Sequence, residues 1–151
     1  MAGINIVHVP YKGAAPAMVD LIAGQVQMIF QIAPGALSQI QAGKVRALAV
    51  TSAKRSRLVP DVPTVAESGF AGYEAIGWNG LVAPAGTPQA IVAKLNGEVL
   101  RSLSQPAILQ RFTDVGWEPA AENSPAWFAD YIKREIAKWA QVVKETGAKV
   151  D

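Results

Sequence analysis

The sequence has no cysteine among its 151 residues, which excludes disulfides, thiolate metal sites and thiol nucleophiles. Charge is also scarce, since only 17% of the residues are Asp, Glu, Lys or Arg and the net charge is +2. No block of basic residues stands out, so the sequence indicates no nucleic-acid partner. Half of the residues are hydrophobic, which argues against a disordered or fibrous chain and for a folded one.

Long hydrophobic runs are absent as well. No apolar stretch approaches the roughly 20 residues that a membrane-spanning helix needs. The first residues, Ala2 to Asn5, have neither the basic start nor the apolar run of a signal peptide. We therefore expect a chain that, as written, is neither inserted in a membrane nor exported. Because strand-like residues begin almost at once, we also expect a fragment of a longer protein.

Signatures of catalysis are few. The single histidine, His8, lies in a strand pattern, and we interpret it as a packed or hydrogen-bonded strand residue. No serine has the Gly-x-Ser-x-Gly frame, and no metal-ligand spacing or glycine-rich phosphate loop occurs. A pair of carboxylates is the one catalytic device that the sequence leaves open. We interpret the candidates as ordinary surface residues: Asp20, Asp61, Glu67 and Asp114. We expect no enzyme, no cofactor and no metal.

The first half of the chain alternates between strand and helix patterns. Helices are predicted over residues 13–24 and 34–42, each closed by a glycine. Runs rich in β-branched residues predict strands over residues 4–9, 26–32 and 45–51. This βαβαβ order is typical of an α/β fold with a mostly parallel sheet and flanking helices.

The second half is predicted to be mainly helical. A proline- and glycine-rich hinge at residues 83–88 follows an extended segment from 73 to 82. Thr87 is the expected N-cap of a helix that ends near residue 103, and a short helix over 106–113 and a short strand over 116–119 follow. Ser124 should cap a long helix that ends near residue 145. Its apolar stripe must be covered by something: Phe128, Ile132, Ile136 and Trp139.

The clearest candidate site is the turn from the first predicted strand into the first predicted helix, Tyr11, Lys12, Gly13, Ala14 and Ala15. The first N–H groups of a helix have no partner within it, and the helix dipole adds partial positive charge there. Such a turn can bind a carboxylate without an arginine, and Gly13 lets the backbone come close to a ligand. The alternative is a turn that binds nothing, as in most α/β proteins.

Further candidates would flank this turn if the predicted sheet forms. Gln31 leaves the second predicted strand and Ser52 the third, and open α/β sheets bind ligands outside the carboxyl ends of parallel strands. Trp78 could form an aromatic wall of the cleft or pack at a lobe junction. One loop could dock an acidic surface, although a solvated loop is the interpretation we prefer; its basic residues are Lys54, Arg55 and Arg57.

Five segments, taken in order, resemble the Bug or TctC family, the extracytoplasmic solute receptors of tripartite tricarboxylate transporters. They are IVHVPYKG (6–13), AGQV (23–26), GKVRALAVT (43–51), PDVPTVAE (60–67) and GLVAPAGTP (80–88). The resemblance implies a two-lobe, periplasmic-binding-protein-like α/β receptor. Such a receptor closes on a small carboxylate, from a mono- to a tricarboxylate or an amino acid, and delivers it to a membrane permease. It also implies that the turn at residues 11–15 lines the cleft.

Members of this family are about twice as long as this chain. The resemblance therefore implies that residues 1–83 form the second ligand-binding lobe. Residues 84–151 would be the hinge return and the C-terminal helices that complete a missing first lobe. The position of Gln31 often holds aspartate in the family, so the neutral amide here fits a ligand without an amine. With its covering surface missing, the C-terminal helix should mediate homo-oligomerisation.

Overall fold

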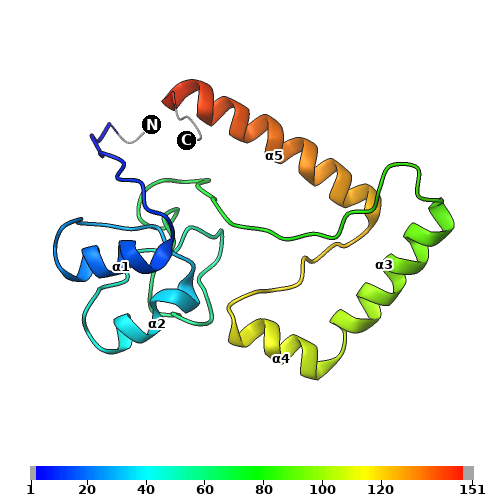
Figure 1. Cartoon of the computed structure of the whole chain (residues 1–151), viewed down its shortest axis with the longest axis horizontal. Coiled ribbons are helices and arrows are strands. Elements are labelled where there is room, and N and C mark those ends of the chain that lie inside the picture. Colours follow the sequence, from blue (N-terminus) through cyan, green and yellow to red (C-terminus); the bar gives the residue numbers. More distant parts are fainter. Residues whose placement is uncertain (1–2, 148–151) are drawn as a thin grey trace. The chain divides into compact units, whose positions relative to one another are not determined.

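The computed structural model describes residues 3–147, and the chain divides into two compact units, Met1–Trp78 and Asn79–Asp151. The first unit contains two helices, α1 (Ala14–Ile22) and α2 (Ala33–Gln41). The second contains three, α3 (Gln89–Leu103), α4 (Pro106–Asp114) and α5 (Pro125–Thr146) (Figure 1). All five lie where the sequence predicts helices. The division between lobes at residue 83 stays a prediction.

The two helices of the first unit begin and end at local signals. Gly13 is the N-cap of α1, and Gly24 follows its end with a φ of 74°. Pro34 lies in the first turn of α2, where its missing N–H costs nothing, and Gly43 follows with a φ of 66°. Only Met18 of these helices is buried.

The predicted strands are wrong as paired elements, because within residues 3–147 they lie outside regular secondary structure. The exception is an isolated parallel bridge between Val50 and Thr64. The Val50 N–H donates to the Pro63 carbonyl at 2.8 Å and the Val65 N–H to the Val50 carbonyl at 2.9 Å. β-Branched residues favour an extended backbone, but a strand also needs a neighbouring backbone at hydrogen-bonding distance, which composition does not supply.

A closed hydrogen-bonded loop follows the bridge. The Thr64 Oγ1 accepts from the Glu67 N–H at 3.0 Å, while the Glu67 Oε2 accepts from the Thr64 N–H at 2.7 Å. This is the reciprocal arrangement of a capping box. The Arg55 Nε donates to both carboxylate oxygens of Glu67, at 3.0 and 3.1 Å. Thr64 is 2% exposed, so the loop is anchored at its base.

In the second unit, one predicted cap is confirmed and one is wrong. The Ser124 side chain accepts from the Trp127 N–H at 3.1 Å and caps α5, as predicted. Pro88, not Thr87, is the N-cap of α3, because the Thr87 hydroxyl donates to the Pro84 carbonyl at 2.8 Å instead. The Asn96 side chain of α3 donates to the Asn123 carbonyl just before α5, at 2.6 Å.

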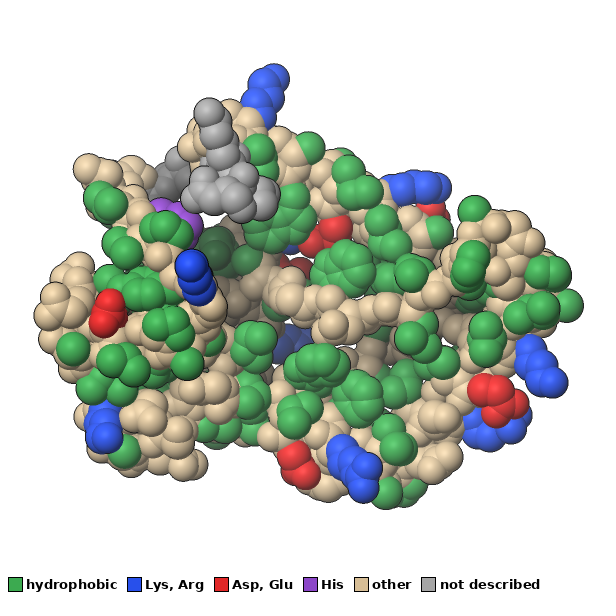
Figure 2. Space-filling view, in the orientation of Figure 1, with side chains coloured by type: hydrophobic (Ala, Val, Ile, Leu, Met, Phe, Trp, Pro, Cys, Tyr) green, Lys and Arg blue, Asp and Glu red, His purple; other side chains and the backbone are tan. Residues whose placement is uncertain are grey.

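Few side chains are buried. Within the described residues, Met18 and Thr64 alone are less than a tenth exposed. Large apolar side chains are exposed in both units, among them Val7 at 79% in the first and Val82 at 84% in the second. Figure 2 shows hydrophobic side chains spread over the visible face. Much apolar surface is therefore left without cover.

Candidate functional site

The predicted turn has a backbone that glycine alone adopts easily. Gly13 has φ 137° and ψ 174°, in a region that side chains make costly. A Cβ built on Gly13 would have no atom within 4 Å, so the position opens on free space. A ligand can therefore approach the backbone here without meeting a side chain.

The N-terminus of α1 is electrostatically uncompensated. No side chain caps the helix and its first turn carries no acidic residue. Ala14 and Ala15 are exposed, and Pro16 has no N–H to offer. Lys12, also exposed, adds a cation that forms no ion pair within the described residues. Backbone donors, helix dipole and ammonium together favour an anion at this position.

Tyr11 is tied to the far part of the same helix. Its hydroxyl donates a 2.7 Å hydrogen bond to the Oδ2 of Asp20, and the pair is partly buried. This hydrogen bond raises the pKa of Tyr11 above its ordinary value of 10.0, with desolvation and the negative charge of Asp20 as smaller causes. The bond holds the residue that precedes the turn in one orientation. The sequence did not reveal the role of Asp20, because a contact nine residues away has no local signature.

Gln31 lies just before Ile32, the N-cap of α2. Its Oε1 accepts from the Ile32 N–H at 3.2 Å. Its Nε2 lies 3.0 Å from the place where a Cβ on Gly35 would be, so Gly35 leaves room for the amide. The hydrogen bond between Gln31 and Ile32 is local and does not join Gln31 to the turn at residues 11–15. Trp78, at the end of the first unit, is 42% exposed. The convergence of Gln31 and Trp78 with the turn stays a prediction.

Three other sequence candidates have roles that differ from those expected. His8 is exposed and forms no hydrogen bond within the described residues, so the packed or hydrogen-bonded reading is wrong. The Ser52 hydroxyl donates to the Lys54 carbonyl at 2.7 Å and so closes its own loop. Arg55 forms an ion pair with Glu67. The spacing Thr-x-x-Glu at residues 64–67 is a capping-box signal that the sequence analysis missed.

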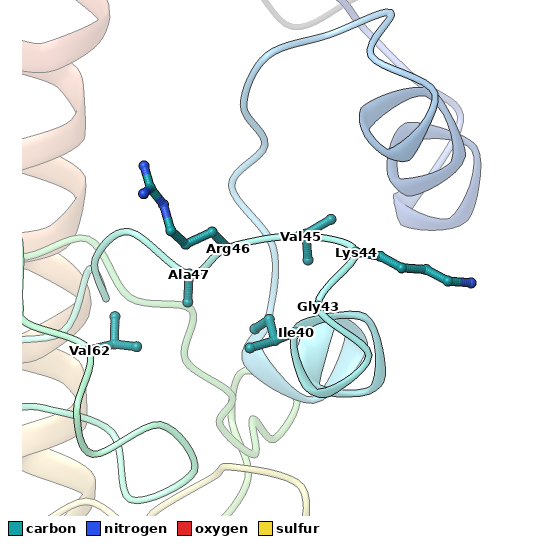
Figure 3. Close-up of a pocket in the computed structure, with 7 residues that line it drawn as sticks. All are labelled: Ile40, Gly43, Lys44, Val45, Arg46, Ala47 and Val62. Carbon is teal, nitrogen blue, oxygen red and sulfur yellow. The ribbon is translucent and has the colours of Figure 1, made fainter.

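A hollow of about 560 Å³ lies elsewhere in the first unit. Figure 3 shows Lys44 and Arg46 at its edge, with side chains that point in opposite directions. The two cationic side chains therefore do not converge on a common point, as a carboxylate site would require of them. No residue of the turn lines the hollow, which is formed by Ile40, Gly43, Lys44, Val45, Arg46, Ala47 and Val62.

Residues 3–147 contain neither a metal-binding cluster nor a membrane-spanning helix. No group of three or more His, Asp or Glu side chains comes together in a way that could hold a metal ion. No helix in this range is both long and apolar enough to cross a membrane.

Solved structures define the class of protein. The chain resembles an R. palustris protein with adipate, at a TM-score of 0.81 and 39% identity over 97% of this chain and 49% of that chain. It also resembles MatC from Rhodopseudomonas palustris with bound malate, at a TM-score of 0.69 and 42% identity over 89% of this chain and 47% of that chain. Another match is the periplasmic binding protein BugD. The fold is thus that of the α/β periplasmic binding proteins, although little of the sheet is paired here.

The family follows from the sequence itself. Residues 1–148 match the model of the tripartite tricarboxylate transporter family receptor, TctC, and the chain belongs to this family. Protein BugT of Bordetella pertussis is 40% identical over 149 residues, which are 99% of this chain and 45% of BugT. Such relatives are receptors rather than enzymes, and the predicted membership of the Bug/TctC family is confirmed.

The match covers only part of most relatives. The chain spans about half the length of the first curated relatives that it matches, with 42–45% of each covered. A shorter Pseudomonas knackmussii relative, 34% identical, is covered over 84% of its length.

Proposed function

We propose that this chain captures a small organic carboxylate in the periplasm for the membrane permease of a tripartite tricarboxylate transporter, as part of a receptor. The observation that carries the proposal is the match over 97% of the chain to a protein with adipate, at a TM-score of 0.81. The match to MatC with malate supports the same ligand class, because adipate and malate are both dicarboxylates. The reaction is binding alone, with no catalytic step.

The turn at residues 11–15 is the proposed carboxylate site. The Ala14 and Ala15 N–H groups would donate to one carboxylate oxygen or to an ordered water beside it. Hydrogen bonds to a charged group contribute about 1.5–3 kcal/mol each. Lys12 would add attraction at longer range. Tyr11, held by Asp20, would border the ligand without moving when it binds.

The selectivity of the site rests on neutral groups. Gln31 carries no charge to pair with an amine, which favours carboxylates without an amino group. Trp78 offers an apolar wall for the carbon chain. In a two-lobe receptor the second lobe excludes water from the ligand when the cleft closes. One half of such a cleft alone should therefore bind with lower affinity than a whole receptor.

We also propose that the chain forms a homo-oligomer through its C-terminal helix. Two observations support this proposal: the apolar residues exposed on α5 and the small number of buried side chains among residues 3–147.

A thermal-shift screen of mono-, di- and tricarboxylates tests the receptor function, with each compound analysed afterwards for turnover. Stabilisation by a dicarboxylate without turnover is the expected result. Conversion of the compound would point to an enzyme instead. The absence of any shift up to millimolar ligand would contradict carboxylate capture by this chain.

A further inference from the structure

Gly35, the third residue of α2, is a glycine that the backbone does not require. Its φ is not positive, unlike those of Gly24 and Gly43, which follow the helix ends at 74° and 66°. Its N–H donates to the Ile32 carbonyl at 3.0 Å, a bond that any residue except proline could form. Within a helix glycine is less favourable than alanine, because it loses more conformational freedom. The absence of a side chain here therefore has another cause.

The space beside Gly35 is taken by the side chain of Gln31. A Cβ on Gly35 would lie 3.0 Å from the Gln31 Nε2, 3.4 Å from its Cδ and 3.8 Å from its Cγ, and these are the three nearest atoms. Gly97 in α3, by contrast, has nothing within 4 Å of the place where its Cβ would be. A separation of 3.0 Å is shorter than the optimal contact between a methyl group and an amide nitrogen. A side chain at position 35 would thus push the Gln31 amide away.

The Gln31 amide is held with its oxygen toward the backbone. Its Oε1 accepts from the Ile32 N–H at 3.2 Å. A glutamine amide has one acceptor oxygen and an NH₂ group with two donors. The Nε2 therefore carries both donors, and it forms no hydrogen bond within residues 3–147. Gln31 is half-buried, so the amide is partly enclosed and its donors are still within reach of a ligand.

The segment around Gln31 carries no negative charge. Residues 21–60, which include the whole of α2, contain no Asp or Glu. An amine facing Gln31 would find no carboxylate from this segment to pair with, whereas an oxygen acceptor would meet free donors. A carboxylate accepts the strongest hydrogen bonds from such donors, because the bonds are charge-assisted. The charged side chains of the segment are all cationic: Lys44, Arg46, Lys54, Arg55 and Arg57.

We propose that Gln31 donates from Nε2 to the second carboxylate of a dicarboxylate ligand, and that Gly35 is the positioning residue that keeps this donor in place. This inference rests on the proposed function, in which the turn at residues 11–15 binds the first carboxylate. Gln31 then selects ligands with two carboxylates through a hydrogen bond, and not only through its lack of a charge. Gly35 acts through Gln31, since its missing side chain leaves room for the amide.

Isothermal titration of adipate and hexanoate into the full chain tests the donor, because hexanoate has the same carbon chain with one carboxylate. Gln31→Met keeps the side chain neutral and Gln31→Glu keeps the oxygen that accepts from Ile32, but neither has the amide donor. Both variants should bind adipate at least about tenfold more weakly than the wild type, as expected for the loss of a hydrogen bond to a charged group. Gln41→Met, at the exposed other end of α2, should bind adipate like the wild type.

Hexanoate separates the donor role from a supporting role in the fold. It should bind the wild type more weakly than adipate does, and Gln31→Met should leave its affinity unchanged. Equal losses for the two ligands in Gln31→Met, or an unchanged adipate affinity, would overturn the inference and leave carboxylate capture standing. A wild type that binds neither compound would contradict the proposed function itself, and this inference with it.

Gly35→Ala tests the positioning role, with Gly97→Ala as the matched control in α3. Neither substitution should lower the melting temperature, because alanine favours a helix more than glycine does. Gly35→Ala alone should weaken adipate binding by about threefold, less than Gln31→Met because the donor is displaced rather than removed. In a Gln31→Met background, Gly35→Ala should have no further effect on affinity. A merely structural contact would lower stability and affinity together. That result, an additive loss in the double variant, or an unchanged affinity in Gly35→Ala would overturn the role of Gly35.

Discussion

The hydroxyl of Tyr11 donates a 2.7 Å hydrogen bond to the carboxylate of Asp20, two turns into α1. The bond joins the residue before the candidate turn to the helix whose N-terminus forms it. The conformation of the turn thus depends on a hydrogen bond to Asp20, which lies outside the turn itself.

Tyr11→Phe removes this bond and keeps the ring. We expect a lower melting temperature and weaker carboxylate affinity, because the residue before Gly13 loses its fixed orientation. Tyr73→Phe is the matched control, since the Tyr73 hydroxyl forms no hydrogen bond within the described residues. Differential scanning calorimetry and ligand titration measure both variants. Equal effects of the two substitutions would contradict the role of Tyr11.

The pH dependence of stability should reveal the loop closed by Glu67. The Thr64 N–H, and after it the Arg55 guanidinium, lower the pKa of Glu67 below its ordinary value of 4.5. Because the pKa in the folded state is the lower one, the stabilisation is present above pH 4.5. It is lost as the pH falls through the folded pKa.

Urea unfolding of the wild type and of Glu67→Gln over this range measures the effect. The difference in unfolding free energy should be largest near pH 7 and should shrink below pH 4.5. Glu74→Gln is the control, and it should leave the acid branch unchanged. A difference between wild type and Glu67→Gln that does not vary with pH would show that the ionised form of Glu67 is not what stabilises the loop.

Gln31 should influence which carboxylates bind. Gln31→Asp places a negative charge at this position, which should weaken binding of succinate and favour aspartate, the same skeleton with an amino group. Gln27→Asp, an exposed position in the preceding loop, controls for the added charge. Isothermal titration of the two ligands gives the affinity ratio. An unchanged ratio in Gln31→Asp would remove Gln31 from the proposed site.

The contact between Gly80 and Phe128 can be tested by a pair of glycine substitutions. Gly80→Ala places a methyl group in the Phe128 ring, and overpacking of this kind costs about 1–3 kcal/mol. Gly77→Ala, three residues earlier, meets no atom within 4 Å and should be close to neutral. Chemical denaturation distinguishes the two. Equal stabilities would show that Phe128 has room to move.

The helices could be predicted because their signals are local. Pro34 in a first turn, Ser124 as a cap and the glycines after α1, α2 and α5 each act over a few residues of backbone. The strands could not, because a ladder depends on a second backbone that the local sequence does not describe. Val50 finds such a partner at Thr64, whereas residues 4–9 do not.

The same distinction between local and non-local signals applies to the candidate site. The turn at Gly13 was predictable from a strand-like run followed by small residues and a helix pattern. The hydrogen bond between Tyr11 and Asp20 was not, because it depends on where the tyrosine ring lies beside α1. The hydrogen bonds between Thr64 and Glu67 could have been predicted, since the two residues have the spacing of a capping box.

Carboxylate binding at the turn is the central claim, and isothermal titration of adipate and malate into the wild type and Gly13→Val tests it most directly. A side chain at Gly13 strains the backbone and fills the open approach to the Ala14 and Ala15 N–H groups. We predict that Gly13→Val weakens binding more than about tenfold. Gly86→Val, which introduces the same side chain at another positive φ with open space, should bind like the wild type. Equal affinity in the wild type and Gly13→Val would contradict the account.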